Sequence, residues 1–207
     1  MALFTKNYPP EIADRIPPGQ RLVKSWPVLH YGPIPTFDGT EWDLEMSGLV
    51  EHPFTLSYQE LRALPTVTVG ADMHCVTGWT TLDNEWEGIP LRVIAEGAKP
   101  KAEARWVLTH CEHGYTSDLS LEAMLDDDVL VAWGHGGASL EPQHGYPLRL
   151  VVPKRYAWKS AKWLRGLEFL DRNVRGFWEV RGYHVHADPW AEERYSYQES
   201  KGSEAEP

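Results

Sequence analysis

The stretch that decides the fold begins with Thr66-Val67-Thr68-Val69 and continues, after a short gap, with Met73-His74-Cys75-Val76-Thr77-Gly78-Trp79. The run 66–69 alternates and is rich in β-branched residues, so it predicts a strand. Cys75 is expected in the loop that follows, where a rigid strand end can hold a thiolate in a fixed position. Soft thiolates suit late or high-valent metals. From this residue alone, a small buried hydrophobe is the more frequent role of a free cysteine.

Short strands and shorter helices are predicted on both sides of this stretch. Trp42, Leu44 and Met46 alternate with polar residues and indicate a half-buried strand. Ser57 and Glu60 form a capping-box pattern that predicts a short helix before Pro65. Further strands are expected at 105–109, 129–133 and 148–152, and further helices at 91–96, ended by Gly97, and at 120–125. Because helices and strands do not alternate regularly, we expect an α+β fold with a strand-rich core.

The length of 207 residues fits one domain. We expect residues 1–38, which are rich in proline, to form an irregular N-terminal wrap around a domain at 39–190. Residues 191–207 are expected to form a C-terminal tail, of which 200–207 are polar and predicted to be disordered.

Composition excludes several classes of function. A formal charge of −10 disfavours nucleic acid and anionic membranes as partners. No apolar stretch is long enough for a membrane span, and no signal-peptide core is visible. Two cysteines do not make a disulfide framework, so a reducing, cytoplasmic location is expected. Ten tryptophans suit either a core or an aromatic-walled cavity.

A cluster of basic and polar residues surrounds the run 147–153. Leu148, Leu150 and Val152 are expected to face the core, which leaves Arg149 on the opposite face. The neighbouring residues that could help Arg149 to bind a phosphate monoester are His144, Lys159, Ser160 and Lys162. Ion pairs of Arg149 and Lys162 with some of the thirty acidic residues are an equally good explanation from the sequence alone.

Zinc is a weaker interpretation of the histidines and cysteines. His74-Cys75 and His110-Cys111 are adjacent pairs, and adjacent residues of an extended chain point to opposite faces. The spacing typical of structural zinc sites is absent around them.

Several motifs of the chain resemble those of a known family. The segments MHCVTGW, WEGIPL, HGYPLRLVVP, WKSAKWL and GFWE, followed by GYH, are similar to the molybdopterin-binding domain of the sulfite oxidase family. They extend from about residue 70 to 186. Within that family, the chain most resembles short bacterial oxidoreductases related to the catalytic subunit of the periplasmic methionine sulfoxide reductase.

The resemblance implies a pyranopterin dithiolene that carries molybdenum, with tungsten as a possible replacement. By position, Cys75 would be the protein thiolate on the metal and the catalytic ligand. The residues that the resemblance places around the cofactor are His30, His110, His144, Arg149, Lys159, Ser160 and Lys162. Backbone of the glycine-rich loop 133–137 is expected to approach the cofactor, although an ordinary tight turn explains these glycines as well. The residues expected at the substrate entrance are Trp79, His110, Tyr115 and Tyr146.

Two departures from the family concern the substrate. The region Trp26–Gly32 lacks the arginine that sulfite oxidases carry there, and Gly78 and Trp79 stand where basic residues are usual. We therefore expect two-electron oxygen-atom transfer on a small substrate other than sulfite, in a direction left open, with an external electron donor or acceptor. The alternative is a non-catalytic or cofactor-carrier module that binds molybdopterin or another small anion. The oligomeric state is not predicted.

Overall fold

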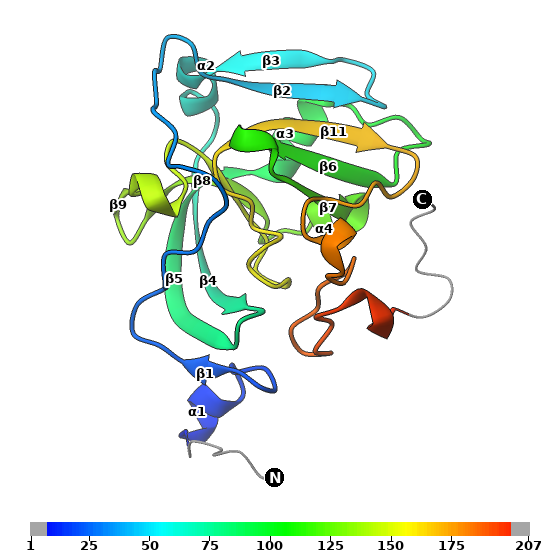
Figure 1. The fold of residues 1–207 in the computed structure, drawn as a ribbon. Helices are drawn as coiled ribbons and strands as arrows, with labels where there is room; N and C mark the ends of the chain where they lie inside the picture. Colours follow the sequence, from blue (N-terminus) through cyan, green and yellow to red (C-terminus); the bar gives the residue numbers. More distant parts are fainter. Residues whose placement is uncertain (1–7, 200–207) are drawn as a thin grey trace.

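The computed structural model describes residues 8–199, which form two β-sheets with short helices around them (Figure 1). The six-stranded sheet contains β1 (Arg21–Leu22), β4 (Val67–Cys75), β5 (Trp79–Pro90), β8 (Leu130–His135), β9 (Ala138–Ser139) and β10 (Arg149–Val151). The five-stranded sheet contains β2 (Asp43–Gly48), β3 (Phe54–Ser57), β6 (Trp106–Cys111), β7 (Thr116–Ser120) and β11 (Leu164–Leu170). The α-helices are α1 (Pro10–Ala13), α2 (Tyr58–Arg62), α3 (Leu91–Ala98) and α4 (Leu121–Met124). The 3₁₀ turns are η1 (Glu112–Gly114), η2 (Pro142–His144), η3 (Glu179–Arg181) and η4 (Ser196–Gln198).

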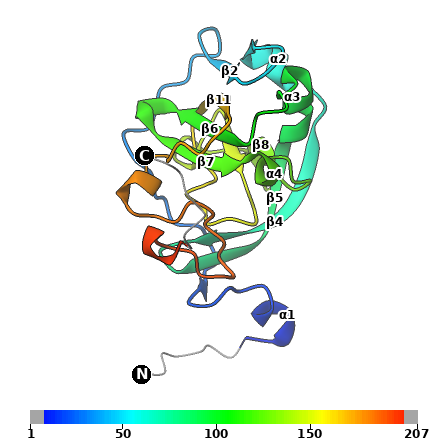
Figure 2. The ribbon, with the colours of Figure 1, turned by 90° about the vertical axis from the view of Figure 1, so that its right-hand side faces the viewer.

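Strand β5 organises the six-stranded sheet. It pairs antiparallel with β4 and β8 and parallel with the short β1, and β8 in turn pairs with β10. Figure 2 shows β4 and β5 as a long curved hairpin, and the short β1 pairs with the start of β5. Gly88 is required where β5 passes β8, because a Cβ at this position would lie 2.1 Å from the carbonyl oxygen of Val131.

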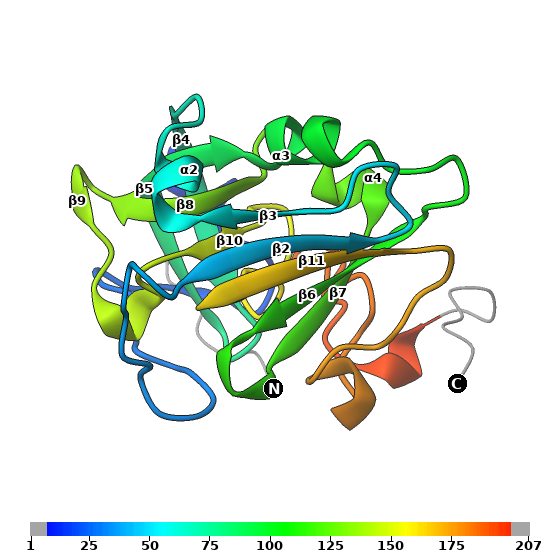
Figure 3. The same cartoon turned by 90° about the horizontal axis from the view of Figure 1, so that it is seen from above.

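The five-stranded sheet has the order β3-β2-β11-β6-β7 (Figure 3). Strand β11 lies parallel to β2 and antiparallel to β6, and the other pairs are antiparallel. The alternation predicted around residue 44 is confirmed, because Leu44 and Met46 are fully buried in β2 while Glu45 is exposed.

One hydrophobic core joins the two sheets, so the chain forms a single α+β domain. Phe169 and Leu167 of β11 belong to the same buried cluster as Ile89 of β5 and Leu150 of β10. A second buried cluster, which includes Trp86 of β5, contains other side chains of the six-stranded sheet. Both faces of that sheet are therefore covered, and Arg149, on the face opposite Leu150, is itself buried.

Several predicted elements are confirmed and some boundaries are corrected. The capping box of Ser57 and Glu60 is present at the start of α2. Cys75 is the last residue of β4 rather than part of a loop. Helix α3 continues to Ala98 and ends at Lys99, which has φ of 51°, so Gly97 does not end it.

The segments at the two ends of the chain are more regular than predicted within residues 8–199. The N-terminal wrap contains α1 and β1, and β1 pairs with β5. Near the other end, η4 lies inside the predicted tail. Disorder is predicted for residues 200–207, which lie outside the described residues.

Candidate active site

A cavity of about 340 Å³ lies between parts of the chain that are distant in sequence. Its walls come from the segments 26–31, 73–79, 144–149 and 157–163, with Tyr115, Trp178 and Tyr183 completing them. This volume is within the usual range for sites that hold small molecules and cofactors.

Cys75 lines this cavity at the end of β4. Its side chain is not in a disulfide, and the residue is 8% exposed. The sulfur lies 3.2 Å from the hydroxyl oxygen of Thr77. His74 does not line the cavity, and its Nδ1 lies 3.0 Å from the hydroxyl of Thr80. The strand thus presents one thiol to the cavity.

Arg149 lies in the same cavity as a buried cation. The residue is 2% exposed, and its guanidinium donates hydrogen bonds to the carbonyl oxygens of His144 (3.0 Å) and Ser160 (2.9 Å). No carboxylate among residues 8–199 forms an ion pair with it. Burial lowers the pKa of Arg149 to about 9. Because a buried cation without a counter-anion is unfavourable, this site is suited to an incoming phosphate.

Lys162 adds a second cationic group. Its ammonium donates hydrogen bonds to the carbonyl oxygens of Leu29 (2.8 Å) and Gln143 (2.7 Å). Burial, together with the nearby charge of Arg149, lowers the pKa of Lys162 to about 7. Neither Arg149 nor Lys162 forms an ion pair with a carboxylate within residues 8–199, so the ion-pair alternative does not hold there. An anion at this place would favour the charged form of both side chains.

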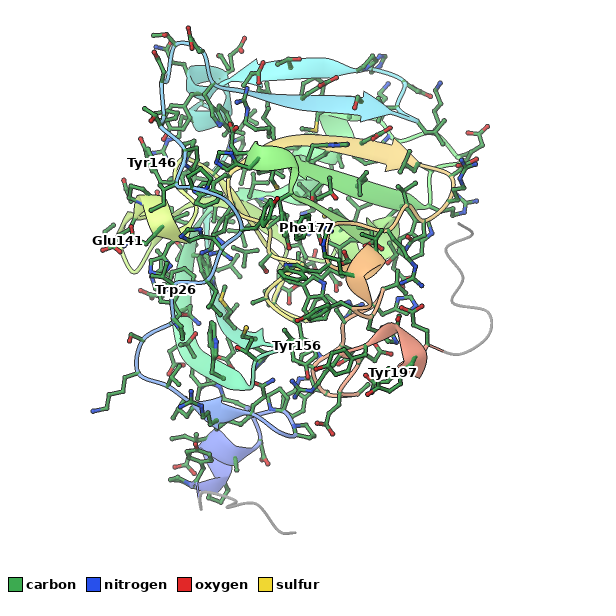
Figure 4. The ribbon with its side chains drawn as sticks, viewed as in Figure 1. Trp26, Glu141, Tyr146, Tyr156, Phe177 and Tyr197 are labelled. Atoms are coloured by element: carbon green, nitrogen blue, oxygen red, sulfur yellow. The ribbon has the colours of Figure 1, made fainter. Side chains whose placement is uncertain are left out.

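His144 closes one side of this cationic region. Its ring stacks on Trp26, with centroids 4.2 Å apart and 6° between the ring planes. Figure 4 shows Trp26 on the same side of the molecule as Glu141, which precedes the η2 turn of His144. Within residues 8–199, the buried Nδ1 of His144 has no hydrogen-bond partner. This orphaned atom, next to Arg149 and Lys162, fits a polar group of a bound cofactor.

Ser160 and His30 also line the cavity. The hydroxyl of Ser160 accepts a hydrogen bond of 3.0 Å from the backbone N–H of Val152, which fixes the segment 157–163 against β10. His30 is exposed, and its ring makes an edge contact with Trp163. Six of the sequence-predicted residues therefore meet at one cavity: His30, Cys75, His144, Arg149, Ser160 and Lys162.

Lys159 does not line the cavity, which corrects the expectation that it helps to bind the cofactor. Its ammonium is fully buried and lies 3.1 Å from a carboxylate oxygen of Asp118 and 2.5 Å from one of Glu179. Burial raises the pKa of Glu179. This lysine faces away from Ser160 and Lys162 and holds β7 and η3 together.

His110 also lies elsewhere. It is on the five-stranded sheet, with its side chain 45% exposed and Nε2 2.8 Å from Glu168 of the neighbouring strand. The predictions that His110 contacts the cofactor and that it lies at the substrate entrance are therefore both corrected. Tyr146 packs on Phe37 with ring centroids 5.1 Å apart and does not line the cavity, whereas Trp79 and Tyr115 do.

The glycine-rich loop 133–137 forms the end of β8 and its turn into β9. Its residues do not line the cavity. Gly136 and Gly137 both have positive φ, so the tight turn is the interpretation that the structure supports.

Aromatic side chains that the sequence did not single out form much of the wall. They are Trp26, Tyr31, Trp158, Trp163, Trp178 and Tyr183. Phe177, labelled in Figure 4, packs behind two of the wall residues, Tyr31 and Tyr115. The number of tryptophans was the available signal, but only the folded chain shows which of them face the cavity.

A family model described as the oxidoreductase molybdopterin binding domain matches residues 31–178, so the chain belongs to this family of molybdopterin-binding oxidoreductases. The fold, the oxidoreductase class and the molybdenum cofactor expected from the sequence are thereby confirmed. The roles of individual side chains stay predictions. The cofactor fits the site, because one thiol, two cations without carboxylate partners among residues 8–199 and an orphaned imidazole nitrogen lie around one cavity.

The chain is similar to two curated relatives over most of its length. It is 46% identical to the uncharacterized oxidoreductase YuiH of Bacillus subtilis over 195 residues, 94% of this chain and 98% of that protein. It is 29% identical to the protein-methionine-sulfoxide reductase catalytic subunit MsrP of Campylobacter jejuni, over 69% of this chain and 54% of that protein. The chain thus spans about half the length of MsrP.

Among solved structures, the sulfane dehydrogenase SoxCD of Paracoccus pantotrophus superposes with a TM-score of 0.63. The match covers 84% of this chain and 56% of that chain at 23% identity, which shows a shared fold. No helix within residues 8–199 has the length and apolar character that crossing a bilayer requires.

Proposed function

We propose that this chain catalyses two-electron oxygen-atom transfer on a small, uncharged substrate, with Cys75 as the protein ligand of molybdenum. The observation that carries this proposal is that Cys75 and Arg149, from different strands, line the same cavity. A thiolate is a suitable ligand for the metal, and a guanidinium is a suitable partner for the phosphate of the organic cofactor.

Each polar residue of the cavity has a distinct part in this proposal. Arg149 and Lys162 would neutralise the cofactor phosphate, and the hydroxyl of Ser160 and the ring of His144 would complete its hydrogen bonds. His30 would contact the cofactor from the segment 26–31. When bound, the cofactor supplies the two-electron redox change, and the protein positions it and excludes bulk water.

The proposed class of substrate follows from the charges of the cavity wall. Among the described residues, the lysine and arginine that line it are Arg149 and Lys162, and both belong to the phosphate region. The wall that also contains Cys75 is otherwise largely aromatic, with Trp79, Trp158 and Tyr183 among its residues. A neutral S-oxide or N-oxide with apolar substituents suits such a wall better than sulfite or nitrate, which need a cation. The name of the MsrP relative, a methionine sulfoxide reductase, supports the same choice.

An oxidoreductase also needs an electron partner, and we propose that it is a separate protein or small carrier. Within residues 8–199, no three His, Cys, Asp or Glu side chains are grouped so that they could hold a metal ion. The cytoplasmic location stays a prediction.

The test compares the wild-type protein with Cys75→Ser. The variant should keep the bound pterin, because Arg149 and Lys162 are intact, but should show an altered molybdenum spectrum. We expect turnover with sulfoxides or N-oxides to fall by at least about 100-fold, since even residues that only support a metal ligand contribute 10- to 100-fold.

The matched control is Cys111→Ala, because Cys111 is also buried and unbridged but does not line the cavity. This control should retain turnover. Unchanged turnover of Cys75→Ser would contradict the ligand assignment. Stoichiometric molybdenum with no turnover on any neutral or anionic substrate would instead favour the cofactor-carrier alternative.

A further inference from the structure

The turn that contains Cys75 is held by groups from both ends of the chain. The carbonyl oxygen of Cys75 accepts hydrogen bonds from the backbone N–H of Gly78 (2.9 Å) and from the side-chain amide of Gln20 (3.0 Å). The next carbonyl, of Val76, accepts a hydrogen bond of 2.5 Å from the guanidinium of Arg194. The carbonyl of Gly78 accepts one of 3.1 Å from the backbone N–H of Arg21. Three of the four peptide carbonyls of the turn are therefore fixed.

This fixed turn sets where the hydroxyl of Thr77 lies. The hydroxyl oxygen is 3.2 Å from the sulfur of Cys75, within hydrogen-bond distance for sulfur, and both residues line the cavity. Threonine is β-branched, so its side chain has few rotamers available and the hydroxyl position is restricted.

The direction of this hydrogen bond follows from the state of the sulfur. A cysteine that binds a metal is a thiolate and has no proton to donate. Thr77 must then be the donor and the sulfur the acceptor.

We propose that Thr77 is a positioning residue whose hydrogen bond to the Cys75 thiolate raises the reduction potential of the metal centre. The inference rests on the proposed function, because it requires Cys75 to bind the metal. A hydrogen bond withdraws electron density from the sulfur, so the thiolate donates less to the metal. The reduced, more electron-rich metal is then stabilised relative to the oxidised one, as hydrogen bonds to sulfur do in other metal centres.

The decisive variant is Thr77→Val, which keeps the shape of the side chain and removes the hydroxyl. Thr77→Ser keeps the hydroxyl and serves as the conservative rescue. Thr68→Val is the matched control, because Thr68 lies exposed on β4, the strand that ends at Cys75, and does not line the cavity. Each protein is purified with its cofactor, and the midpoint potentials of the molybdenum couples are measured by redox titration followed by electron paramagnetic resonance.

We expect a more negative midpoint potential for Thr77→Val, a value near wild type for Thr77→Ser, and no change for Thr68→Val. Molybdenum content should be equal in all four proteins. A potential of Thr77→Val equal to that of wild type would overturn the inference, and so would a serine variant as shifted as the valine variant.

The failure of this inference is distinguishable from failure of the proposed function. If the wild-type protein holds molybdenum with cysteine ligation and Thr77→Val leaves its potential unchanged, only the role of Thr77 is lost. If Cys75→Ser leaves the molybdenum spectrum unaltered, the metal ligand lies elsewhere and both proposals fail together.

Discussion

The indole of Trp26 lies flat on the imidazole of His144, 4.2 Å away between centroids. The guanidinium of Arg149 also lies 5.2 Å from the centroid of the Trp26 ring. One residue of the N-terminal segment thus covers two side chains of the proposed phosphate site, although it precedes both far upstream in the sequence. The segment 26–31 is therefore part of the site.

Replacement of Trp26 by alanine should weaken retention of the cofactor. Stacking of aromatic rings contributes about 0.5–1.5 kcal/mol beyond burial, which corresponds to roughly 2- to 12-fold in affinity. The measurement is the rate at which pterin is released from purified protein on dilution. Trp190→Ala is the control, because Trp190 is 50% exposed and lies outside the cavity, and it should release the cofactor at the wild-type rate. Equal release rates for both variants would show that the Trp26–His144 stack does not support the site.

Replacement of Arg149 by methionine should reduce the cofactor content of the purified protein. A hydrogen bond to a charged group contributes about 1.5–3 kcal/mol, so affinity should fall by roughly 10- to 150-fold. Molybdenum and pterin per protein chain are the quantities to measure. Arg165→Met provides the comparison, since Arg165 pairs with Asp43 and Glu112 away from the cavity. Full occupancy in Arg149→Met would place the phosphate site elsewhere.

The affinity of the cofactor-free protein for phosphate should depend on the charge of Lys162. Its pKa is lowered to about 7 in the folded protein, below its ordinary value of about 10.4. The positive charge of Lys162 is lost as the pH rises through 7. The affinity for phosphate should therefore fall above that pH, by at most about tenfold per pH unit. In the unfolded chain, Lys162 keeps its proton up to the ordinary lysine pKa of about 10.4. Between pH 7 and that value the unfolded chain therefore binds more protons than the folded one, so the free energy of unfolding of the empty protein should rise with pH.

Calorimetric titration with inorganic phosphate between about pH 6 and pH 9 measures this effect. Lys162→Arg is the suitable control, because a guanidinium keeps its charge to a higher pH than an ammonium in the same place. The variant should show a flatter dependence than wild type above pH 7. If the phosphate affinity of the two proteins depends on pH in the same way, another group controls the affinity.

Replacement of Lys159 by methionine should destabilise the fold rather than the cofactor site. It would leave Asp118 and Glu179 buried without a cation, which costs about 3–5 kcal/mol in comparable cases. Lys154→Met tests the opposite situation, because Lys154 forms exposed pairs with Asp126 and Asp128, worth about 0–1 kcal/mol. Denaturant unfolding of both variants gives the two free energies. If Lys159→Met lowers the free energy of unfolding by no more than Lys154→Met does, the buried ion pairs of Lys159 do not stabilise the fold.

Local sequence patterns were sufficient for the elements whose partners are close along the chain. The capping box of Ser57 and Glu60 was predicted because its hydrogen bonds join residues three positions apart. The strands around Leu44 and Leu150 were predicted because alternate side chains point to opposite faces. The long strand β5 was not predicted, since its twelve residues mix polar and apolar positions and pair with three different strands in turn.

By itself, the sequence determined that a strand would lead to Cys75 and that Arg149 would lie on the face opposite Leu148 and Leu150. It also determined the family, through the order of its motifs. Tertiary structure alone decided that Lys159 faces Asp118 and that His110 lies on the other sheet. The physical reason is that periodicity specifies which side chains share a face of a strand. Whether that face meets a cavity, a buried carboxylate or solvent depends on segments from distant parts of the chain.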